Sequence, residues 1–215
     1  FALLIFFATL PFTFMRHLVA SSQNVYYKKR GMRDAAMPLS LEADSIGART
    51  IKDFTWKQLL ESEACVSCGR CEENCPASQA EKPLSPRKVM QDILSQMEQS
   101  GRKGSCTQTD DLPLLAEAIS ADEIWACTSC MACVTHCPVL IEPLNKIIDM
   151  RRYQVMGKAR LPAEARPMIR DLEIYGDVQG KGLAHRADWA MNREVPQLVQ
   201  TSTQSESEVE VLLWV

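Results

Sequence analysis

Eight of the nine cysteines in this chain fall into two short runs with the same internal spacing, C-x2-C-x2-C-x3-C-P. The first run extends from Cys65 to Pro76 and the second from Cys127 to Pro138, so the pattern repeats after 62 residues. Thiolates placed three residues apart can surround one face of a cuboidal iron–sulfur cluster, and the fourth cysteine points away from that face. The two runs therefore predict two [4Fe–4S] clusters that are part of the fold.

The ligands of each cluster follow from the known behaviour of this run. In two-cluster ferredoxins the fourth cysteine of one run ligates the other cluster. The expected ligands of the first cluster are Cys65, Cys68, Cys71 and Cys137. The expected ligands of the second cluster are Cys127, Cys130, Cys133 and Cys75. Two alternatives are weaker, because zinc sites usually show paired C-x2-C units with a long gap and disulfides are rare in a reducing cytosol.

The residues between and around the runs have helical patterns. Capping boxes precede each run, at Thr55 to Gln58 and at Ser120 to Glu123. Apolar residues recur at helical spacing, which predicts helices over residues 85–101, 112–119 and 143–157. We therefore expect an all-α fold, an α-helical ferredoxin in which the clusters sit in loops that begin helices.

The N-terminal segment is apolar for 15 residues before its first charge, Arg16. A spanning helix needs about 20 apolar residues, so residues 1–22 are expected to be the C-terminal part of a transmembrane helix. Residues 23–49 form a basic juxtamembrane linker that contains Lys28, Lys29, Arg30 and Arg33. By the positive-inside rule, the cysteine runs would lie on the cytoplasmic side of the membrane. A buried core segment or a processed tail is the alternative.

After the basic linker, the chain is expected to continue through three parts. Residues 50–160 form the two-cluster domain, and residues 161–207 form a helical or irregular linker that ends in a polar stretch. Residues 208–215 alternate and then become continuously apolar, which is typical of a strand that enters a buried sheet. The chain therefore reads as an internal fragment of a longer protein.

The composition excludes some functions. The 24 Lys and Arg residues are balanced by 27 Asp and Glu residues, a net charge of −3, which argues against a nucleic-acid-binding protein. No acid–base pair, nucleophile constellation or glycine-rich nucleotide loop accompanies the cysteines. We therefore expect no catalytic residue and no substrate site in this chain.

Residues 50–160 resemble the α-helical dicluster ferredoxin domain of the heterodisulfide-reductase-like iron–sulfur oxidoreductases. Besides the two cysteine runs, the residues that carry the resemblance are Asp53 to Leu60, Lys82 to Pro86, Ile124 to Trp125 and Ile148 to Arg152. The resemblance is to the membrane-fused branch, in which a cytochrome-b-type domain similar to the gamma subunit of nitrate reductase precedes the ferredoxin domain. In that branch a cysteine-rich oxidoreductase domain follows, and its first strand would be residues 208–215.

The same resemblance implies a haem ligand. Pro11 to His17 matches the end of the cytochrome-b-type domain, where the family has a histidine that is an axial ligand of haem b. His17 is therefore expected to bind haem b in the intact protein, although Phe14 stands where a basic residue is usual. The alternative is an interfacial histidine that only reaches toward water.

Several residues outside the two ligand sets also have expected roles. Trp56 and Trp125 are expected to pack over the clusters and exclude water. Arg151 and Arg152 either line a docking face for an acidic partner or belong to a solvated helix face. His136 and His185 are expected at the surface and Cys106 is expected to be a bystander thiol.

The expected function is membrane-associated electron transfer through the two clusters. The resemblance implies electron-transfer flavoprotein or a dehydrogenase as the soluble partner, and a haem and the quinone pool on the membrane side. Two alternatives belong to other classes: the iron–sulfur component of a heterodisulfide-reductase-like catalytic enzyme, and an iron–sulfur sensor. A paired cysteine-rich domain downstream would favour the enzyme, and rapid loss of one cluster in air would favour the sensor.

Overall fold

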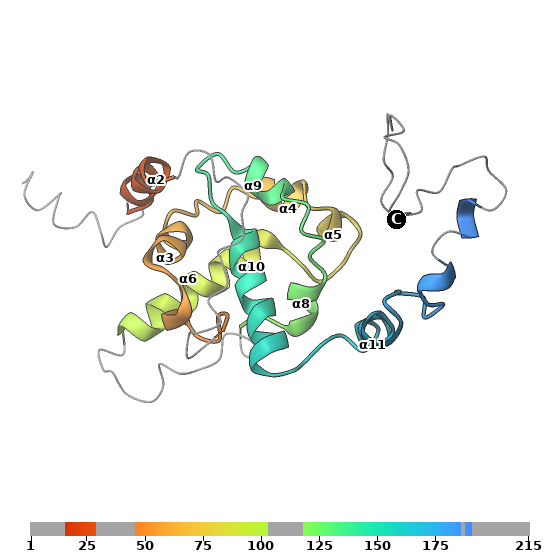
Figure 1. The fold of residues 1–215 in the computed structure, drawn as a ribbon. Helices are drawn as coiled ribbons and strands as arrows, with labels where there is room; N and C mark the ends of the chain where they lie inside the picture. Colours follow the sequence, from red (N-terminus) through yellow and green to blue (C-terminus); the bar gives the residue numbers. More distant parts are fainter. Residues whose placement is uncertain (1–15, 29–45, 103–117, 186–187, 191–215) are drawn as a thin grey trace, which may run out of the picture. The chain divides into compact units, whose positions relative to one another are not determined.

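The computed structural model describes residues 16–28, 46–102, 118–185 and 188–190, in two units that divide after Arg160 (Figure 1). The described residues contain helices and no strand, which agrees with the all-α prediction. Three predicted features lie outside the described residues: the strand at 208–215, the thiol of Cys106 and most of the helix at 112–119.

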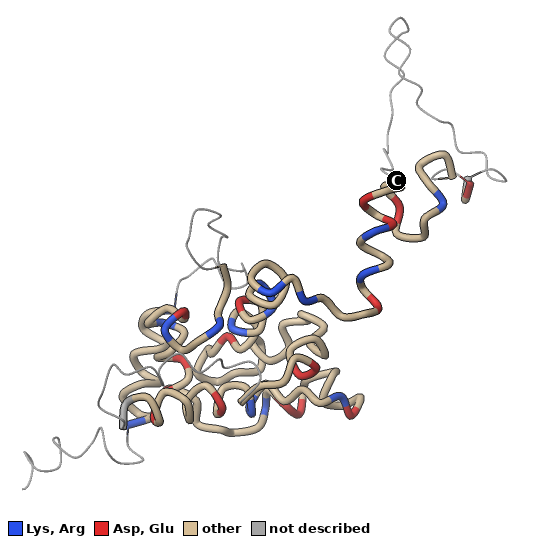
Figure 2. Tube along the Cα trace, turned by 90° about the horizontal axis from the view of Figure 1, so that it is seen from below, with Lys and Arg blue, Asp and Glu red and all other residues tan. Residues whose placement is uncertain are grey.

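The first unit consists of short helices joined by loops. In chain order its elements are α2 (Arg16–Tyr26), η2 (Ile51–Asp53), α3 (Trp56–Glu63), α4 (Arg70–Glu73), α5 (Pro76–Gln79), α6 (Pro86–Arg102), α8 (Ala121–Trp125), α9 (Ala132–Thr135), α10 (Pro143–Arg152) and the π-helical η4 (Tyr153–Gly157). Helix α10 packs against α6, α8 and α9, and α3 packs against both α2 and α6. Acidic and basic positions are interspersed along the chain of this unit (Figure 2).

Both predicted capping boxes are present. The Thr55 side chain accepts a hydrogen bond from the Gln58 amide at the start of α3, and Ser120 accepts one from the Glu123 amide at the start of α8. In return, the Glu123 carboxylate accepts a hydrogen bond of 2.7 Å from the Ser120 amide. These caps satisfy amides that would otherwise lack a partner, and so they fix where the helix before each cysteine run begins.

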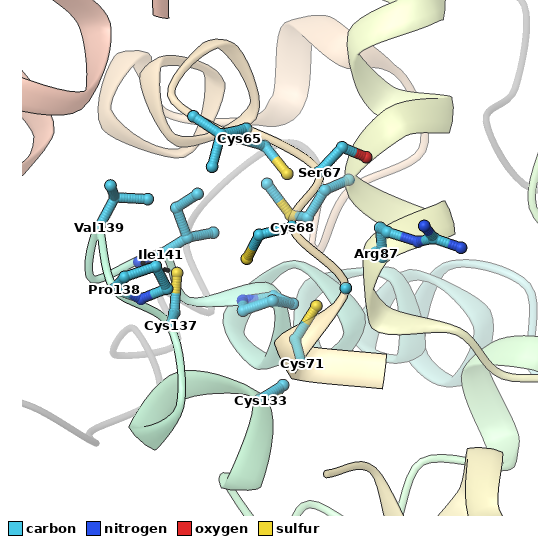
Figure 3. Close-up of a pocket in the computed structure, with 14 residues that line it drawn as sticks. Cys65, Ser67, Cys68, Cys71, Arg87, Cys133, Cys137, Pro138, Val139 and Ile141 are labelled. Carbon is cyan, nitrogen blue, oxygen red and sulfur yellow. Dashed lines mark hydrogen bonds between the residues drawn. The ribbon is translucent and has the colours of Figure 1, made fainter. Parts of the chain in front are cut away.

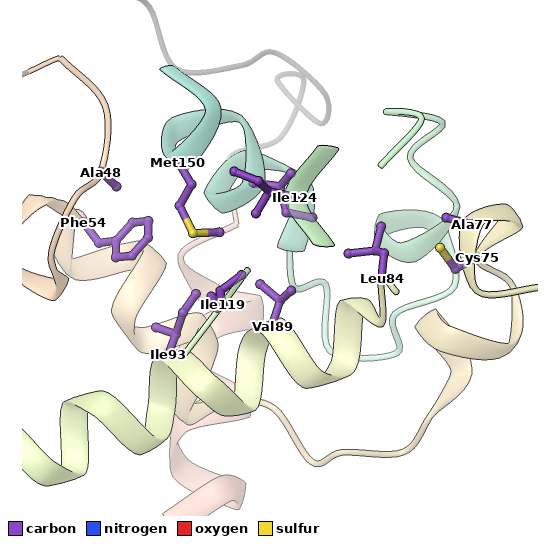
Figure 4. Packing of buried hydrophobic residues seen from close by; sticks show 11 residues of the cluster. Ala48, Phe54, Cys75, Ala77, Leu84, Val89, Ile93, Ile119, Ile124 and Met150 are labelled. Atoms are coloured by element: carbon purple, nitrogen blue, oxygen red, sulfur yellow. The ribbon is translucent and has the colours of Figure 1, made fainter. Parts of the chain in front are cut away.

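The core of the unit lies between α6 and α10. Val89 and Ile93 of α6 are buried, and they face Ile124 of α8 and Met150 of α10 (Figure 4). Each fully buried side chain of this size stabilises the fold by about 1.5–3 kcal/mol. The helix predicted to begin after Ser85 is confirmed, and its apolar face forms one wall of this core.

Gly47 allows the chain to pass closely over the end of α10. Its φ is +83°, and a Cβ atom there would overlap the backbone of Asp149 and Tyr153. The next amide, of Ala48, donates a hydrogen bond of 2.9 Å to the Asp149 carbonyl. At this point α10 changes to the π-helical η4, which ends at the predicted stop, Gly157. Only glycine fits this contact.

Helix α2 contains the described part of the predicted transmembrane segment. It runs past the expected boundary at residue 22 to Tyr26, and it packs against α3 with Ala20 and Asn24 buried. The Asn24 side chain donates a hydrogen bond of 2.7 Å to the Val139 carbonyl. Among the described residues, no helix has the length and apolar character that crossing a membrane requires. Residues 1–15, the larger part of the predicted transmembrane segment, lie outside the described part of the chain.

The second unit, residues 161–215, is described only in part. It contains α11 (Ala165–Tyr175) and two short 3-10 helices, η5 (Leu183–His185) and η6 (Asp188–Ala190). Helix α11 ends at Gly176, which has a φ of +68°. The segment expected to be helical or irregular is therefore helical at its start.

Candidate metal centre

Each cysteine run folds into the same loop and short helix. Helix α3 ends at the C-cap Ala64, and Ser67 and Gly69 then adopt φ values of +57° and +84° before α4 begins. In the second run, Ser129 and Met131 adopt φ values of +56° and +66° before α9 begins. These left-handed positions turn the chain back on itself in both runs.

Four cysteines face a cavity at the first loop. The side chains of Cys65, Cys68 and Cys71 surround the same space as that of Cys137, which comes from the second run (Figure 3). The space between these residues is about 390 Å³ when the adjoining open solvent is included, and Cys133 also lines it. The structure therefore brings together the four residues that were expected to share the first cluster.

The second set of cysteines is identified by its electrostatic neighbours. Burial and then the sulfurs of Cys127, Cys71, Cys75 and Cys130 raise the pKa of the Cys133 thiol to about 12. Three of these neighbours are the residues that were expected to share a cluster with Cys133, and Cys75 comes from the first run. The fourth neighbour, Cys71, belongs to the first set, so the two sets lie next to each other.

The chemistry of the first set fits a metal-bearing group. Burial, followed by the sulfurs of Cys65, Cys137 and Cys68, raises the pKa of the Cys71 thiol to about 11. Burial also raises the pKa of Cys65. Four thiolates this close repel one another in a low-dielectric site, and metal ions supply the positive charge that allows them to ionise. The donor set therefore fits a group that carries several iron ions.

Backbone amides point at the sulfurs, as they do at iron–sulfur sites. The Ser129 amide donates a hydrogen bond of 3.4 Å to Cys127 Sγ, and the Ile141 amide donates one of 3.3 Å to Cys137 Sγ. None of the eight described cysteines forms a disulfide. Nor do the described residues contain three or more His, Cys, Asp or Glu side chains arranged to hold a single metal ion.

A buried ion pair that was not expected from the sequence lies beside the first set of cysteines. Lys146 Nζ and Glu61 Oε2 are 2.5 Å apart, and Lys146 is completely buried. Burial raises the pKa of the Cys65 thiol, and the positive charge of Lys146 offsets a small part of that rise. The sequence signal was the position of Glu61 four residues before Cys65, together with a lysine inside the otherwise apolar face of α10.

The structure places the predicted haem ligand, His17, on α2. Its Nδ1 atom is 2.8 Å from the carbonyl oxygen of Glu63, two residues before the first cysteine run. Next to it, Ser21 Oγ donates a hydrogen bond of 3.1 Å to the Ala64 carbonyl. Helix α2 therefore holds the chain just before Cys65.

The prediction for Trp56 was wrong, because 63% of this residue is exposed and its ring contacts Tyr27 at a centroid distance of 5.3 Å. Trp125 is partly buried against the core. Its ring also lies 5.1 Å from the guanidinium carbon of Arg151. His136 is exposed, as expected, and its Nδ1 lies 2.9 Å from the Ala132 carbonyl oxygen.

Neither interpretation of Arg151 matches the structure. Its side chain is half-buried and folds onto the loop of the second run, where it donates a hydrogen bond of 2.6 Å to the Ile124 carbonyl. The sequence did contain a signal, because Arg151 continues the stripe of Leu144, Ile147 and Ile148 at helical spacing. An arginine in an apolar stripe points inward and needs buried partners.

Comparison with known proteins supports the iron–sulfur interpretation. Residues 61–141 match the family described as the 4Fe-4S dicluster domain. The chain is 32% identical to the EtfAB:quinone oxidoreductase of Syntrophomonas wolfei over 98% of its own length and 33% of that protein. It is also 32% identical to a probable membrane-anchored ferredoxin of Chromohalobacter salexigens, over 87% of this chain and 28% of that protein.

A third relative supports the resemblance to heterodisulfide reductases. The chain is 28% identical to an iron–sulfur component of the CoB–CoM heterodisulfide reductase of Methanopyrus kandleri, over 54% of this chain and 50% of that protein. No solved structure matches the chain. The chain spans about a third of the length of the two bacterial relatives. Residues 61–141 therefore match a 4Fe-4S dicluster domain, in a chain whose relatives include a quinone oxidoreductase and an iron–sulfur component of heterodisulfide reductase.

Proposed function

We propose that this chain passes single electrons through two [4Fe–4S] clusters, between a soluble redox partner and the quinone pool of a membrane. Cys65, Cys68, Cys71 and Cys137 would hold one cluster, and Cys127, Cys130, Cys133 and Cys75 the other. When bound, each cluster supplies a site that gains or loses one electron without a bond being made or broken. No residue of the chain is assigned a catalytic role.

The observation that carries this proposal is the contact between the two cysteine sets. Cys133 of the second set lines the cavity of the first set, and Cys71 of the first set raises the pKa of Cys133. Two redox groups held by these sets would be separated by little more than the cysteines themselves. Such a separation favours electron transfer between them.

The exposure of the cysteines differs in a way that suits a relay. Cys68 and Cys130 occupy equivalent positions in the two runs, and both are exposed. Cys133, which lies where the two sets meet, is buried, and so is Cys75. Each set therefore presents one edge to a partner, while the boundary between the sets is shielded from water.

The partners are proposed from the relatives. One relative is named an EtfAB:quinone oxidoreductase, which supports electron-transfer flavoprotein as the soluble partner and quinone as the membrane partner. Another is named a probable membrane-anchored ferredoxin, which supports a location at the membrane. We place the dicluster domain on the cytoplasmic side, because Lys28, Lys29, Arg30 and Arg33 follow the apolar N-terminal segment.

The haem assignment of His17 stays a prediction. A metal-ligating histidine usually donates its second ring N–H to a carbonyl or carboxylate, which fixes the orientation of the ring. The short distance between His17 Nδ1 and the Glu63 carbonyl fits such a role. It would also connect a haem ligand to the loop that precedes Cys65.

A second candidate function is supported by the match to the iron–sulfur component of heterodisulfide reductase. In that case the dicluster domain would deliver electrons to a disulfide-reducing site elsewhere in the enzyme. Anaerobic assays with a quinone and with a mixed disulfide as alternative electron acceptors distinguish the two functions. Reduction of the quinone alone supports our proposal.

The first experiment is an anaerobic count of iron, acid-labile sulfide and zinc in the purified chain. We expect about eight iron and eight sulfide per chain, as two [4Fe–4S] clusters require. The second experiment mixes the oxidised protein with reduced electron-transfer flavoprotein and follows bleaching of the cluster absorbance. About two zinc ions without sulfide, or no bleaching by the flavoprotein, would overturn the proposal.

A further inference from the structure

The side chain of Arg151 clasps the loop of the second cysteine run. Its Nε and Nη2 atoms donate hydrogen bonds of 2.9 and 2.6 Å to the Ile124 carbonyl. Nη2 also donates to the carbonyls of Trp125 at 3.4 Å and Cys127 at 2.5 Å. Nη1 donates to Ser129 Oγ at 3.4 Å, and the guanidinium group lies over the Trp125 ring. One side chain therefore holds the loop from Ile124 to Ser129.

The positive charge of Arg151 has no carboxylate partner among the described residues. All of its hydrogen bonds within the described part of the chain go to carbonyl or hydroxyl oxygens. The neighbouring Arg152, in contrast, pairs with Asp149 at 3.1 Å. Arg151 is half-buried, so solvent screens its charge less than that of an exposed side chain.

The equivalent region of the first cysteine run is arranged differently. Lys146 lies near Cys65, but its charge is balanced by Glu61 at 2.5 Å. Arg87 lines the cavity of the first set, and it pairs with Glu72 at 2.8 Å while its side chain extends away from the sulfurs (Figure 3).

The carbonyls of the first loop also have different partners. Glu63 corresponds to Trp125 in the 62-residue repeat, and its carbonyl is met by His17 from α2. The next carbonyl, of Ala64, accepts a hydrogen bond from Ser21. An arginine clasp is therefore found at the second run alone, within the described part of the chain.

We propose that Arg151 is a positioning residue that makes the cluster held by Cys127, Cys130, Cys133 and Cys75 the easier of the two to reduce. This inference rests on the proposed function. Reduction adds one electron, supplied by the soluble partner, and no bond forms or breaks. A nearby positive charge that no carboxylate balances stabilises the added negative charge, and hydrogen bonds and net charge are known to set cluster potentials. An electron that enters the chain therefore resides mainly on this cluster.

The test compares midpoint potentials in the full chain. The variants are Arg151→Gln, which removes the charge, and Arg151→Lys, which keeps it. Arg152→Gln is the matched control, because it removes a paired charge one residue away. Iron and sulfide are counted first, and the potential of each cluster is then measured by anaerobic redox titration with paramagnetic resonance detection. Cys68→Ser and Cys130→Ser variants assign each signal to its cluster.

We expect Arg151→Gln to lower the midpoint potential of the cluster held by the second set of cysteines, which is the cluster whose signal changes in Cys130→Ser. The expected change is about tenfold in the equilibrium constant for reduction, which is about 59 mV for one electron. The other cluster should keep its potential, and both should keep theirs in Arg151→Lys and Arg152→Gln.

Unchanged potentials in Arg151→Gln with about eight irons bound, or a shift confined to the cluster that Cys68→Ser alters, would overturn the proposal. If Arg151→Gln loses one cluster, the Arg151→Lys variant provides the test instead. A wild-type potential of the Cys130 cluster in Arg151→Lys supports the charge effect, and a lowered potential contradicts it. If the wild-type chain itself holds no iron–sulfur cluster, it is the proposed function that fails.

Discussion

Glu61 and Lys146 form a buried network in the first unit. Glu61 Oε1 accepts a hydrogen bond of 2.9 Å from Lys57, and Oε2 accepts bonds from Lys146 and from the Glu142 amide. Burial on its own would raise the pKa of Glu61, but Lys146 and Lys57 together lower it. Burial lowers the pKa of Lys146. Glu61 thus accepts hydrogen bonds from three donors, whereas Lys146 donates to one carboxylate and, at 3.4 Å, to the Glu142 carbonyl.

This asymmetry predicts unequal effects of two substitutions. We expect Glu61→Gln to lower the free energy of unfolding by about 3–5 kcal/mol, because it leaves Lys146 buried without a carboxylate. Lys146→Met should cost less, because Glu61 keeps Lys57 and the Glu142 amide as partners. Anaerobic urea denaturation of the iron-loaded protein, followed by circular dichroism, measures both effects. A lysine substitution as costly as the glutamate substitution would contradict this interpretation of the network.

The network also gives a direction for the pH dependence at this residue. Because folding lowers the pKa of Glu61, its ionised form stabilises the fold above the ordinary value of 4.5. This contribution is lost as the pH falls through the folded pKa. The difference in unfolding free energy between the wild type and Glu61→Gln should therefore shrink in acid.

At the scale of elements, the two cysteine runs are copies with different supports. Each has a capped helix, a loop with two left-handed residues and a second short helix. The first loop is held by α2 through His17 and Ser21, and the second by α10 through Arg151. The two loops are therefore held by helices that lie near the beginning and near the end of the first unit's sequence.

The cap of α8 is the feature of these elements that is simplest to test. We expect Ser120→Ala to lower the free energy of unfolding by about 1 kcal/mol, because the Glu123 amide loses its acceptor at the helix start. Ser120→Asn should retain most of the stability, since asparagine also caps helix N-termini well. The urea midpoints of the three proteins provide the comparison. Equal loss in both variants would mean that Ser120 acts in some other way than as a cap.

At the scale of the whole molecule, the chain divides after Arg160, and all eight cysteines of the two runs precede that division. The buried core residues from Ala48 to Met150 also precede it. The second unit begins with α11, whose large apolar residues Met168, Ile169, Leu172 and Ile174 are exposed. The first unit therefore contains all the cysteines that are proposed to hold the clusters, together with the buried core.

We expect a chain that ends at Arg160 to bind the same amounts of iron and sulfide as the full chain. Its thermal midpoint, followed by cluster absorbance, should also match, because the proposed cysteine ligands and the buried core lie within residues 1–160. The full chain, purified in parallel, is the control. Loss of one cluster from the shortened chain would mean that residues 161–215 support a metal site.

The sequence by itself determined the parts of this protein that depend on local spacing. The cysteine runs predicted a 4Fe-4S dicluster domain, and the domain match over residues 61–141 agrees with that prediction. The capping boxes at Thr55 and Ser120 marked the starts of α3 and α8, because a cap involves residues only three positions apart. Helical periodicity placed α6 and α10 for the same reason.

Only the tertiary structure decided what depends on contacts between distant residues. Trp56 was expected over a cluster but is exposed, because nothing in its local sequence reveals which face of α3 meets α6. Arg151 meets Ile124 across 27 positions, and Lys146 meets Glu61 across 85. Such pairs form only when packed helices bring them together, and a buried charge must then find its partner within reach. The pattern of cysteines specifies which metal group can bind, whereas the packing of α2 and α10 sets the charges around each site.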